Sequence, residues 1–454
     1  MKKKLTAKDY VYVASMLFGL FFGAGNLIFP VRMGQMSGAN VLPAILGFLI
    51  TGVGLPLLGV AALGISRCNG LYELSGMVDR RYALFFTCLL YLTIGPFFAI
   101  PRCATTSFTV GIESMLPESA NLRLWLFLFS VAFFGAALFF SLFPGKILTW
   151  VGKILNPLFL VFLGVLIVVA LTSTKGGISS VTPEGSYADA PFPTGFLEGY
   201  NTMDALASLA FGIVVVRAIR DLGVTDSGAV AGSTVRAGVF SCLFMALIYV
   251  AVTLVGVLSR SVFPTAENGG IALAQLAEHH LGKVGLLILA ATVTLACLKT
   301  SVGLITGCAE TFSALFPRGP KYRVWAVTFS LISFLFANLG LDRIVSYSVP
   351  VLMFLYPLAI TLILLALFGR FFENDRIVYL WVTGLALIGA IYDLLRSLPE
   401  NLRSFLHLDS FLGAVADVVP FASAGLAWLC PALLGLVIGI SWHLIKKRAN
   451  RATM

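Results

Sequence analysis

Residues 9–34 read DYVYVASMLFGLFFGAGNLIFPVRMG, a stretch apolar and long enough to cross a lipid bilayer as one helix of about 20 residues. Three glycines, an asparagine and a proline nevertheless fall near its middle, where glycine and proline destabilise a helix. Unwound backbone inside a membrane is tolerated only where it lines a cavity or is buried in protein. We therefore expect a membrane helix that is broken between Gly19 and Pro30, although close packing through small residues would also explain the glycines.

The whole chain is unusually apolar, with 59% hydrophobic and 11% charged residues over 454 positions. A water-soluble domain of this size has too little interior to bury so many apolar side chains, so we expect lipid to cover part of them. The apolar runs are continuous and do not alternate, which favours helices over a membrane β-barrel. We mark twelve membrane-spanning helices, spans 1 to 12, at residues 9–34, 41–66, 80–111, 121–142, 147–172, 194–217, 229–259, 283–311, 323–341, 343–369, 376–396 and 419–445.

The positive charges predict the orientation of these spans. With the N-terminus placed in the cytoplasm, most of the 31 Lys and Arg residues fall on the cytoplasmic side, as the positive-inside rule requires. We therefore expect a multi-pass protein with both termini in the cytoplasm. The same residues give the net charge of +10, and their dispersion along the ends of spans argues against nucleic-acid binding.

A second interrupted span lies at residues 199–212, GYNTMDALASLAFG, where polar and small residues surround Asp204. Spans 1 and 6 each open a set of five spans, and interrupted helices at corresponding positions indicate two inverted repeats. The N-terminus of a half-helix attracts a carboxylate, while carbonyl groups freed by the break attract a cation. An amino acid carries both charges, so this pair of breaks suits a zwitterionic substrate.

Charged residues inside other spans are further candidates for function. Lys299 lies in the middle of span 8, where a lysine costs roughly 2.5–3.5 kcal/mol on insertion scales, so we expect a functional role, with a structural ion pair as the alternative. Arg102 follows two prolines in span 3, and we expect it either to pair with an acid or to extend toward the outer interface. The sequence leaves the roles of Asp204 and Glu310 open.

Other classes of protein find little support. The sequence has no phosphate-binding G-x-x-x-x-G-K loop, no H-x-x-x-H pair and no clustered Cys/His metal set, so we predict no enzymatic activity and no cofactor. The seven cysteines form no C-x-x-C pair and are expected to be reduced. A channel would need a continuous polar lining, for which the spans carry too few charged residues.

Several segments, spread over nearly the whole chain, resemble the branched-chain amino acid carrier family of bacteria (the LIVCS or BrnQ-type family). They are FGLFFGAGNLIFP (18–30), IGPFFAIPR (94–102), EGYNTMDALASLAFGIVVV (198–216), ACLKTSVGLITGCAE (296–310) and NLGLDRIVSYSVPVLMFLYPLAI (338–360). The resemblance implies an all-α polytopic membrane protein with 12 transmembrane helices, arranged as a LeuT-type five-plus-five inverted repeat plus two C-terminal helices. It also implies uptake of Leu, Ile and Val across the bacterial inner membrane, coupled to protons or sodium.

On this basis we expect the first repeat at 1–172, an extracytoplasmic loop at 173–193, the second repeat at 194–369, and spans 11 and 12 with a basic tail at 370–454. The protein would be a symporter that works by alternating access, with residues 271–281 as an outer lid. The expected partners are the amino-acid substrate and the lipid bilayer, with no nucleic acid and no obligate protein partner. The same fold carrying another amino acid or a small nitrogenous solute stays open as the alternative.

The resemblance also implies which residues form the substrate site. Amides in the unwound part of span 1 would bind the carboxylate, the break of span 6 would line the same pocket, and rings of span 3 would form its apolar wall. Cavity shape would select aliphatic side chains, and because each methylene is worth about 1–3 kcal/mol, Leu, Ile and Val could share the site. The residues that match these positions are Gly23, Ala24, Gly25, Asn26, Phe97, Phe98, Ser208, Phe211 and Gly212.

The coupling-ion site of this fold uses carbonyls of span 1 and two neighbouring hydroxyls of span 8. The matching positions are Gly19, Phe22, Lys299, Thr300 and Ser301, so a lysine stands at the first hydroxyl position. Its ammonium could replace the sodium ion, and burial would let it release and bind a proton. If the match is shifted by one residue, Thr300 and Ser301 supply the hydroxyl pair and sodium stays open. We favour coupling through the lysine.

Overall fold

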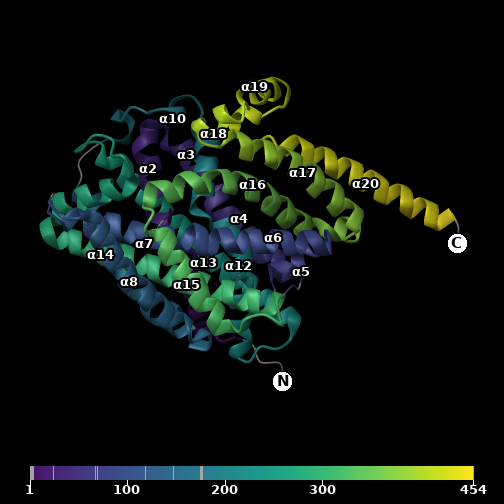
Figure 1. Cartoon of the computed structure of the whole chain (residues 1–454), viewed down its shortest axis with the longest axis horizontal. Helices are drawn as coiled ribbons and strands as arrows, with labels where there is room; N and C mark the ends of the chain where they lie inside the picture. The colour runs from purple at the N-terminus through teal and green to yellow at the C-terminus, as the bar shows by residue number, and fades with distance from the viewer. Residues whose placement is uncertain are drawn as a thin grey trace.

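The computed structural model describes residues 5–23, 25–66, 68, 70–117, 119–146, 148–173 and 177–452, and within them every regular element is a helix (Figure 1). Ten helical stretches among these residues are long and apolar enough to cross a membrane, and α15 (Tyr322–Ala337) is a shorter apolar helix. The predicted all-α architecture is confirmed, and the count of twelve spans stays a prediction. The ten stretches are Gly25–Ile65, Arg80–Met115, Leu122–Ser141, Thr149–Thr172, Pro191–Asp221, Gly228–Ser259, Gly269–Leu315, Leu341–Phe372, Arg376–Arg396 and Leu429–Ala449.

The first span is broken, as predicted. It consists of α1 (Ala7–Phe21) and α2 (Gly25–Ser37). The side chain of Thr6 caps the start of α1, and α1 ends where Phe22 adopts extended backbone with φ −75° and ψ 90°. The helix restarts at Gly25, and the amide of Gly23 donates to the side chain of Asn26 instead of a helical carbonyl.

The sixth span is also broken, at the start of the interrupted stretch 199–212 that the sequence indicates. It consists of α11 (Pro191–Glu198), a single turn of 3₁₀ helix at Gly199–Thr202, and α12 (Asp204–Asp221). Met203 separates the turn from α12, because its left-handed conformation, with φ 64°, cannot continue a helix. The resemblance put the break at Ser208–Gly212. That position is wrong, since these residues lie inside the continuous helix α12.

The remaining helices pack around these two broken spans. Large apolar side chains on α8, α9 and α20 point outward, for example Leu128, Val161 and Val437, where lipid would cover them. The helices are α3 (Val41–Leu49), α4 (Leu55–Ile65), α5 (Leu71–Ser75), α6 (Arg80–Leu92), α7 (Ala99–Thr106), α8 (Leu122–Ser141), α9 (Asn156–Ser173), α10 (Ser186–Asp189), α13 (Ser227–Ser259), α14 (Gly269–Leu315), α16 (Leu341–Phe368), α17 (Arg376–Arg396), α18 (Glu400–Phe405), α19 (Asp409–Val418) and α20 (Leu429–Ala452).

A sharp corner divides α14 into two helices. Gly282 adopts φ 58° and ψ −146°, a conformation that suits only glycine, and it separates residues 269–281 from the long membrane helix that follows. The short helix packs on Ala170 and Val255 through Leu276. Residues 271–281 thus belong to a separate short helix, and their role as an outer lid stays a prediction.

Helices α17 and α20 run side by side along one edge of the molecule (Figure 1). A side chain at Gly389 of α17 would collide with the backbone of Trp428, so glycine allows this close approach. Span 12 was expected to begin at residue 419, but its helix begins at Leu429. The left-handed conformations of Phe421 and Gly425, with φ 64° and 71°, interrupt the chain before it.

Candidate functional site

The two broken spans share one small cavity. Its lining comes from the breaks themselves, from span 3 and from α14, so segments far apart in the sequence meet there. A cavity bounded by unwound backbone is the place where membrane proteins tolerate free peptide groups. The lining residues are Leu20, Phe21, Gly23, Gly25, Asn26, Ile94, Ala99, Arg102, Cys103, Thr202, Met203, Asp204, Ala207, Thr300 and Leu304.

Asn26 connects the two breaks. Its Oδ1 accepts a hydrogen bond from the backbone amide of Gly23 at 2.9 Å, and its Nδ2 donates to Oδ2 of Asp204 at 2.7 Å. The hydroxyl of Tyr249, on α13, donates to the same carboxylate oxygen at 2.6 Å and also contacts Asn26. All three side chains are buried. A satisfied buried network of this kind holds its members rigidly, so the ends of α2 and α12 are fixed relative to each other.

The start of α12 is held by local hydrogen bonds. The hydroxyl of Thr202 donates to the carbonyl of Gly199 at 2.9 Å and accepts the backbone amide of Asp204 at 3.3 Å. These bonds stabilise the left-handed turn at Met203 and set Asp204 in the first turn of α12. A carboxylate in this position interacts favourably with the positive end of the helix dipole.

Arg102 lies in the same cavity and is only 4% exposed. Its guanidinium lies 5.4 Å from the centre of the Phe29 ring, and a Cβ added at Gly25 would come within 3.0 Å of Nη2. Glycine thus leaves room for the guanidinium beside the first residue of α2. Among the described residues Arg102 forms no ion pair, which was the first outcome that the sequence suggested. Its burial in the cavity argues against the second, an extension toward the outer interface.

Three of the four substrate-site residues predicted in span 1 line the cavity: Gly23, Gly25 and Asn26. The fourth, Ala24, lies outside the described residues. This part of the site could be recognised because glycine and asparagine in a row are unusual in the middle of an apolar span.

The two rings predicted in span 3 do not line the cavity. The ring of Phe97 packs on Phe336, with centroids 5.2 Å apart, and Phe98 lies among partly buried residues of the core. The non-helical backbone of Gly95, with ψ −118°, shifts the helical register, so that other side chains of span 3 face inward. Span 3 lines this cavity instead with Ile94, Ala99, Arg102 and Cys103, and the expectation that either ring contacts substrate stays a prediction.

The three residues predicted in span 6 pack behind the cavity. Ser208 hydrogen-bonds the carbonyl of Ala205 at 2.6 Å and faces Gly59 of α4, while Gly212 faces Leu63 of the same helix. Ser208 and Gly212 lie one and two turns beyond Asp204 along the continuous helix α12, where they contact α4 and do not line the cavity.

Phe211 contacts the ring of Phe21, a lining residue, at 5.8 Å between centroids, but does not itself line the cavity. None of Ser208, Phe211 and Gly212 lines this cavity, and their role in the substrate site stays a prediction.

Lys299 of α14 is fully buried and lies next to the break of span 1. Its Nζ donates to Oδ1 of Asn156 at 2.9 Å and lies 3.7, 5.0 and 5.7 Å from the ring centres of Phe159, Phe18 and Phe22. Three aromatic faces and one amide oxygen form an aromatic cage, which suits an ammonium group. We refer to these four residues around Lys299 as the lysine cage.

The other predicted coupling residues lie close by. The hydroxyl of Thr300 donates to the carbonyl of Gly19 at 3.4 Å, so span 8 contacts span 1 at the expected position. The hydroxyl of Ser301 is buried, and no partner for it exists within the described residues. The structure therefore brings Gly19, Phe22, Lys299 and Thr300 together, and only one of the two hydroxyls reaches a carbonyl of span 1.

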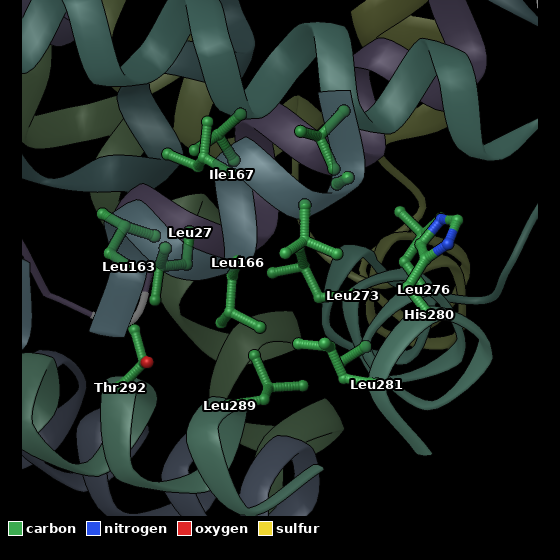
Figure 2. A pocket seen from close by; sticks show the side chains of 15 residues that line it. Leu27, Leu163, Leu166, Ile167, Leu273, Leu276, His280, Leu281, Leu289 and Thr292 are labelled. Atoms are coloured by element: carbon green, nitrogen blue, oxygen red, sulfur yellow. The ribbon is translucent and has the colours of Figure 1, made fainter. Parts of the chain in front are cut away.

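A second cavity lies under the short helix at the start of α14 (Figure 2). Figure 2 shows Leu166, Leu273 and Leu289 pointing into it, with His280 at one side. None of the residues lining this cavity is Asp, Glu, Lys or Arg. It therefore offers no carboxylate, lysine or arginine side chain to either end of a zwitterion, unlike the cavity between the two breaks, which Arg102 and Asp204 line.

Known proteins resemble this chain in sequence or in fold. The sequence profile of the family described as "Branched-chain amino acid transport protein" matches residues 6–446. The branched-chain amino acid permease BrnQ of Lactobacillus delbrueckii subsp. lactis is 49% identical over 99% of this chain and 100% of its own length.

Two solved structures share the fold. One is Mhp1, a transporter of the nucleobase-cation-symport-1 family in a closed conformation, with a TM-score of 0.58, 14% identity and coverage of 96% of this chain and 93% of its own. The other is MhsT in complex with L-phenylalanine, with a TM-score of 0.56, 16% identity and coverage of 98% and 99%. The sequence matches decide the family, and the chain belongs to the branched-chain amino acid transport protein family.

Proposed function

We propose that this protein is a secondary active symporter that imports leucine, isoleucine and valine by alternating access. The observation that carries the proposal is the cavity where two broken membrane helices meet, with a positive and a negative group among its lining residues. The name of the 49% identical relative, a branched-chain amino acid permease, supports this choice of substrate over another amino acid or a small nitrogenous solute.

We further propose a LeuT-type arrangement of twelve spans with both termini in the cytoplasm. Residues 1–172 and 194–369 form the two inverted repeats, 173–193 the outer loop, and 370–454 the added pair of helices with the basic tail. Breaks in spans 1 and 6 support this division, since each break opens one set of five spans. The short helix 269–281 acts as the outer lid.

Coupling proceeds through the side chain of Lys299, which takes the place of a sodium ion and carries a proton. The lysine cage supports this proposal, because aromatic rings bind an ammonium well whereas a hard metal cation prefers oxygen ligands. A wider cavity between α1, α9 and α13 is lined by Asn156 and Ser15. Asn156 Nδ2 donates to Ser15 Oγ at 2.9 Å, so the partner of Lys299 lies at the wall of a route by which a proton can leave.

The coupling proposal is tested in proteoliposomes with an imposed gradient. An inward proton gradient should drive accumulation of labelled leucine at equal sodium concentrations on both sides. Accumulation that follows a sodium gradient and ignores a pH gradient would favour the runner-up, a sodium site that includes Thr300 and the Gly19 carbonyl. Transport of other amino acids in place of Leu, Ile and Val, measured with a substrate panel, would overturn the substrate assignment.

Substitutions in span 3 should separate the cavity wall from its surroundings. Ile94→Trp places a larger side chain in the cavity and should weaken leucine binding by about tenfold or more, since overpacking costs about 1–3 kcal/mol. Phe97→Ala removes a ring that packs on Phe336 and should leave leucine affinity near the wild-type value. Equilibrium binding to purified protein measures both. If Phe97→Ala weakens leucine binding and Ile94→Trp does not, Phe97 belongs to the site.

A further inference from the structure

We propose that Arg102 and Asp204 are the two charge poles of the substrate site, with Arg102 binding the α-carboxylate of the amino acid and Asp204 binding its α-ammonium. This inference rests on the proposed function and adds to it the residues that recognise a zwitterion. Neither residue matched a predicted site position, because the resemblance assigned the carboxylate to backbone amides alone.

The positive pole combines a side chain with a helix terminus. The guanidinium of Arg102 lies beside Gly25, the first residue of α2, where free backbone amides and the helix dipole attract an anion. Among the described residues this guanidinium takes part in no hydrogen bond or ion pair, and it lies over the face of the Phe29 ring. A fork of N–H donors with no protein acceptor, 4% exposed and lining a cavity, is suited to a carboxylate.

The negative pole is set on the opposite break. Asp204 is 1% exposed, lines the same cavity and accepts hydrogen bonds at Oδ2 from Asn26 and Tyr249. Thr202 and Met203, which line the cavity next to it, belong to the turn that precedes α12. A carboxylate beside an interrupted helix provides the acceptor that an ammonium group needs.

The two charges face the cavity without cancelling each other. Within the described residues no ion pair joins Arg102 to Asp204, although both line one small cavity. A charged residue at this depth is costly unless it has a partner, and a zwitterion supplies one partner for each. The site therefore gains most from a ligand that carries both charges, which explains why a membrane protein keeps both residues.

Two other charged groups inside the spans have protein partners. Lys299 lies in the lysine cage and donates to Asn156 there. Glu310 forms an ion pair with Arg217 near the end of α12. Among the lining residues of the cavity, Arg102 and Asp204 are the only two with charged side chains.

The test uses ligands that lack one charge. L-leucine, 3-methylbutylamine (leucine without its carboxylate) and 4-methylpentanoate (leucine without its amino group) are titrated by calorimetry into full-length protein in lipid nanodiscs, up to millimolar concentrations. Arg102→Gln should weaken leucine by about tenfold to a hundredfold and abolish any binding of 4-methylpentanoate, while binding of 3-methylbutylamine stays unchanged. Asp204→Asn should give the mirror pattern, with the amine lost and the acid retained.

Charge-preserving variants separate recognition from folding. Arg102→Lys and Asp204→Glu keep the sign of each pole and should recover part of the leucine affinity that Arg102→Gln and Asp204→Asn lose. Arg403→Gln and Asp409→Asn make the same chemical changes in an ion pair of 3.4 Å between α18 and α19, far along the chain, and should leave leucine affinity unchanged. Thermal melting of each variant reports whether it is folded.

Equal losses for the amine and the acid in both variants, or unchanged leucine affinity in Arg102→Gln, would overturn the assignment of the poles. The proposed function is judged separately, by the wild-type protein. If it binds another amino acid instead of leucine, isoleucine or valine, the substrate assignment fails, and the same variants are titrated with that amino acid and its decarboxylated amine to decide on the poles.

Discussion

Lys299→Ala should abolish proton-driven accumulation of leucine and leave exchange of leucine across the membrane intact. The ammonium of Lys299 lies inside the lysine cage, where it contacts Asn156 and the Phe159 ring. Without it, substrate can still bind between the two breaks, but its movement is no longer tied to that of a proton. Accumulation should then fall to the level of passive equilibration.

The measurement compares two assays in the same proteoliposomes. Uptake under an imposed proton gradient reports coupling, and exchange of labelled for unlabelled leucine at equal pH reports transport alone. Lys146→Ala is the matched control: it removes an exposed lysine in the connection between spans 4 and 5, and it should behave as wild type in both assays. Proton-driven accumulation that survives Lys299→Ala would end the proposal that this lysine carries the proton.

Asn26→Leu should damage both stability and binding. The change keeps the size of the side chain but removes the acceptor of the Gly23 amide and one donor to Asp204, which leaves buried polar groups without partners. Each such group costs about 1–3 kcal/mol, so the variant should lose about 2–4 kcal/mol of stability. Because the two breaks lose their connection, leucine affinity should fall by about a hundredfold.

Thermal unfolding and leucine titration of the purified variant check this expectation. Asn338→Leu is the control: Asn338 lies at the end of α15, is exposed, and hydrogen-bonds only the carbonyl of Phe334 among the described residues. It should melt and bind leucine nearly as the wild type does. A normal leucine affinity in Asn26→Leu would mean that the link between the breaks has no part in recognition.

The features that could be predicted from the sequence are those with a local cause. Gly23, Gly25 and Asn26 disturb an apolar run, so the break of span 1 and three of its lining residues could be recognised there. A lone Lys299 in an apolar span is costly in lipid, and the structure gives it a dedicated cage.

The features that were missed depend on backbone geometry and on distant contacts. The left-handed turn at Met203 sets the break of span 6 at the start of the stretch 199–212, upstream of the Ser208–Gly212 position that the resemblance implied. The twist at Gly95 turns Phe97 out of the cavity. The role of Asp204 follows from contacts with Asn26 and Tyr249, which are 178 and 45 positions away in the sequence. Only the folded chain brings these partners together.

The corner at Gly282 limits how the two helices that it joins can move. A single residue joins the helix 269–281 to the membrane helix that carries Lys299, so there is no slack linker to absorb a displacement of either. A tilt of the long membrane helix is therefore transmitted to the short helix through Gly282. The membrane helix that carries Lys299 and the short helix 269–281 are thereby mechanically coupled.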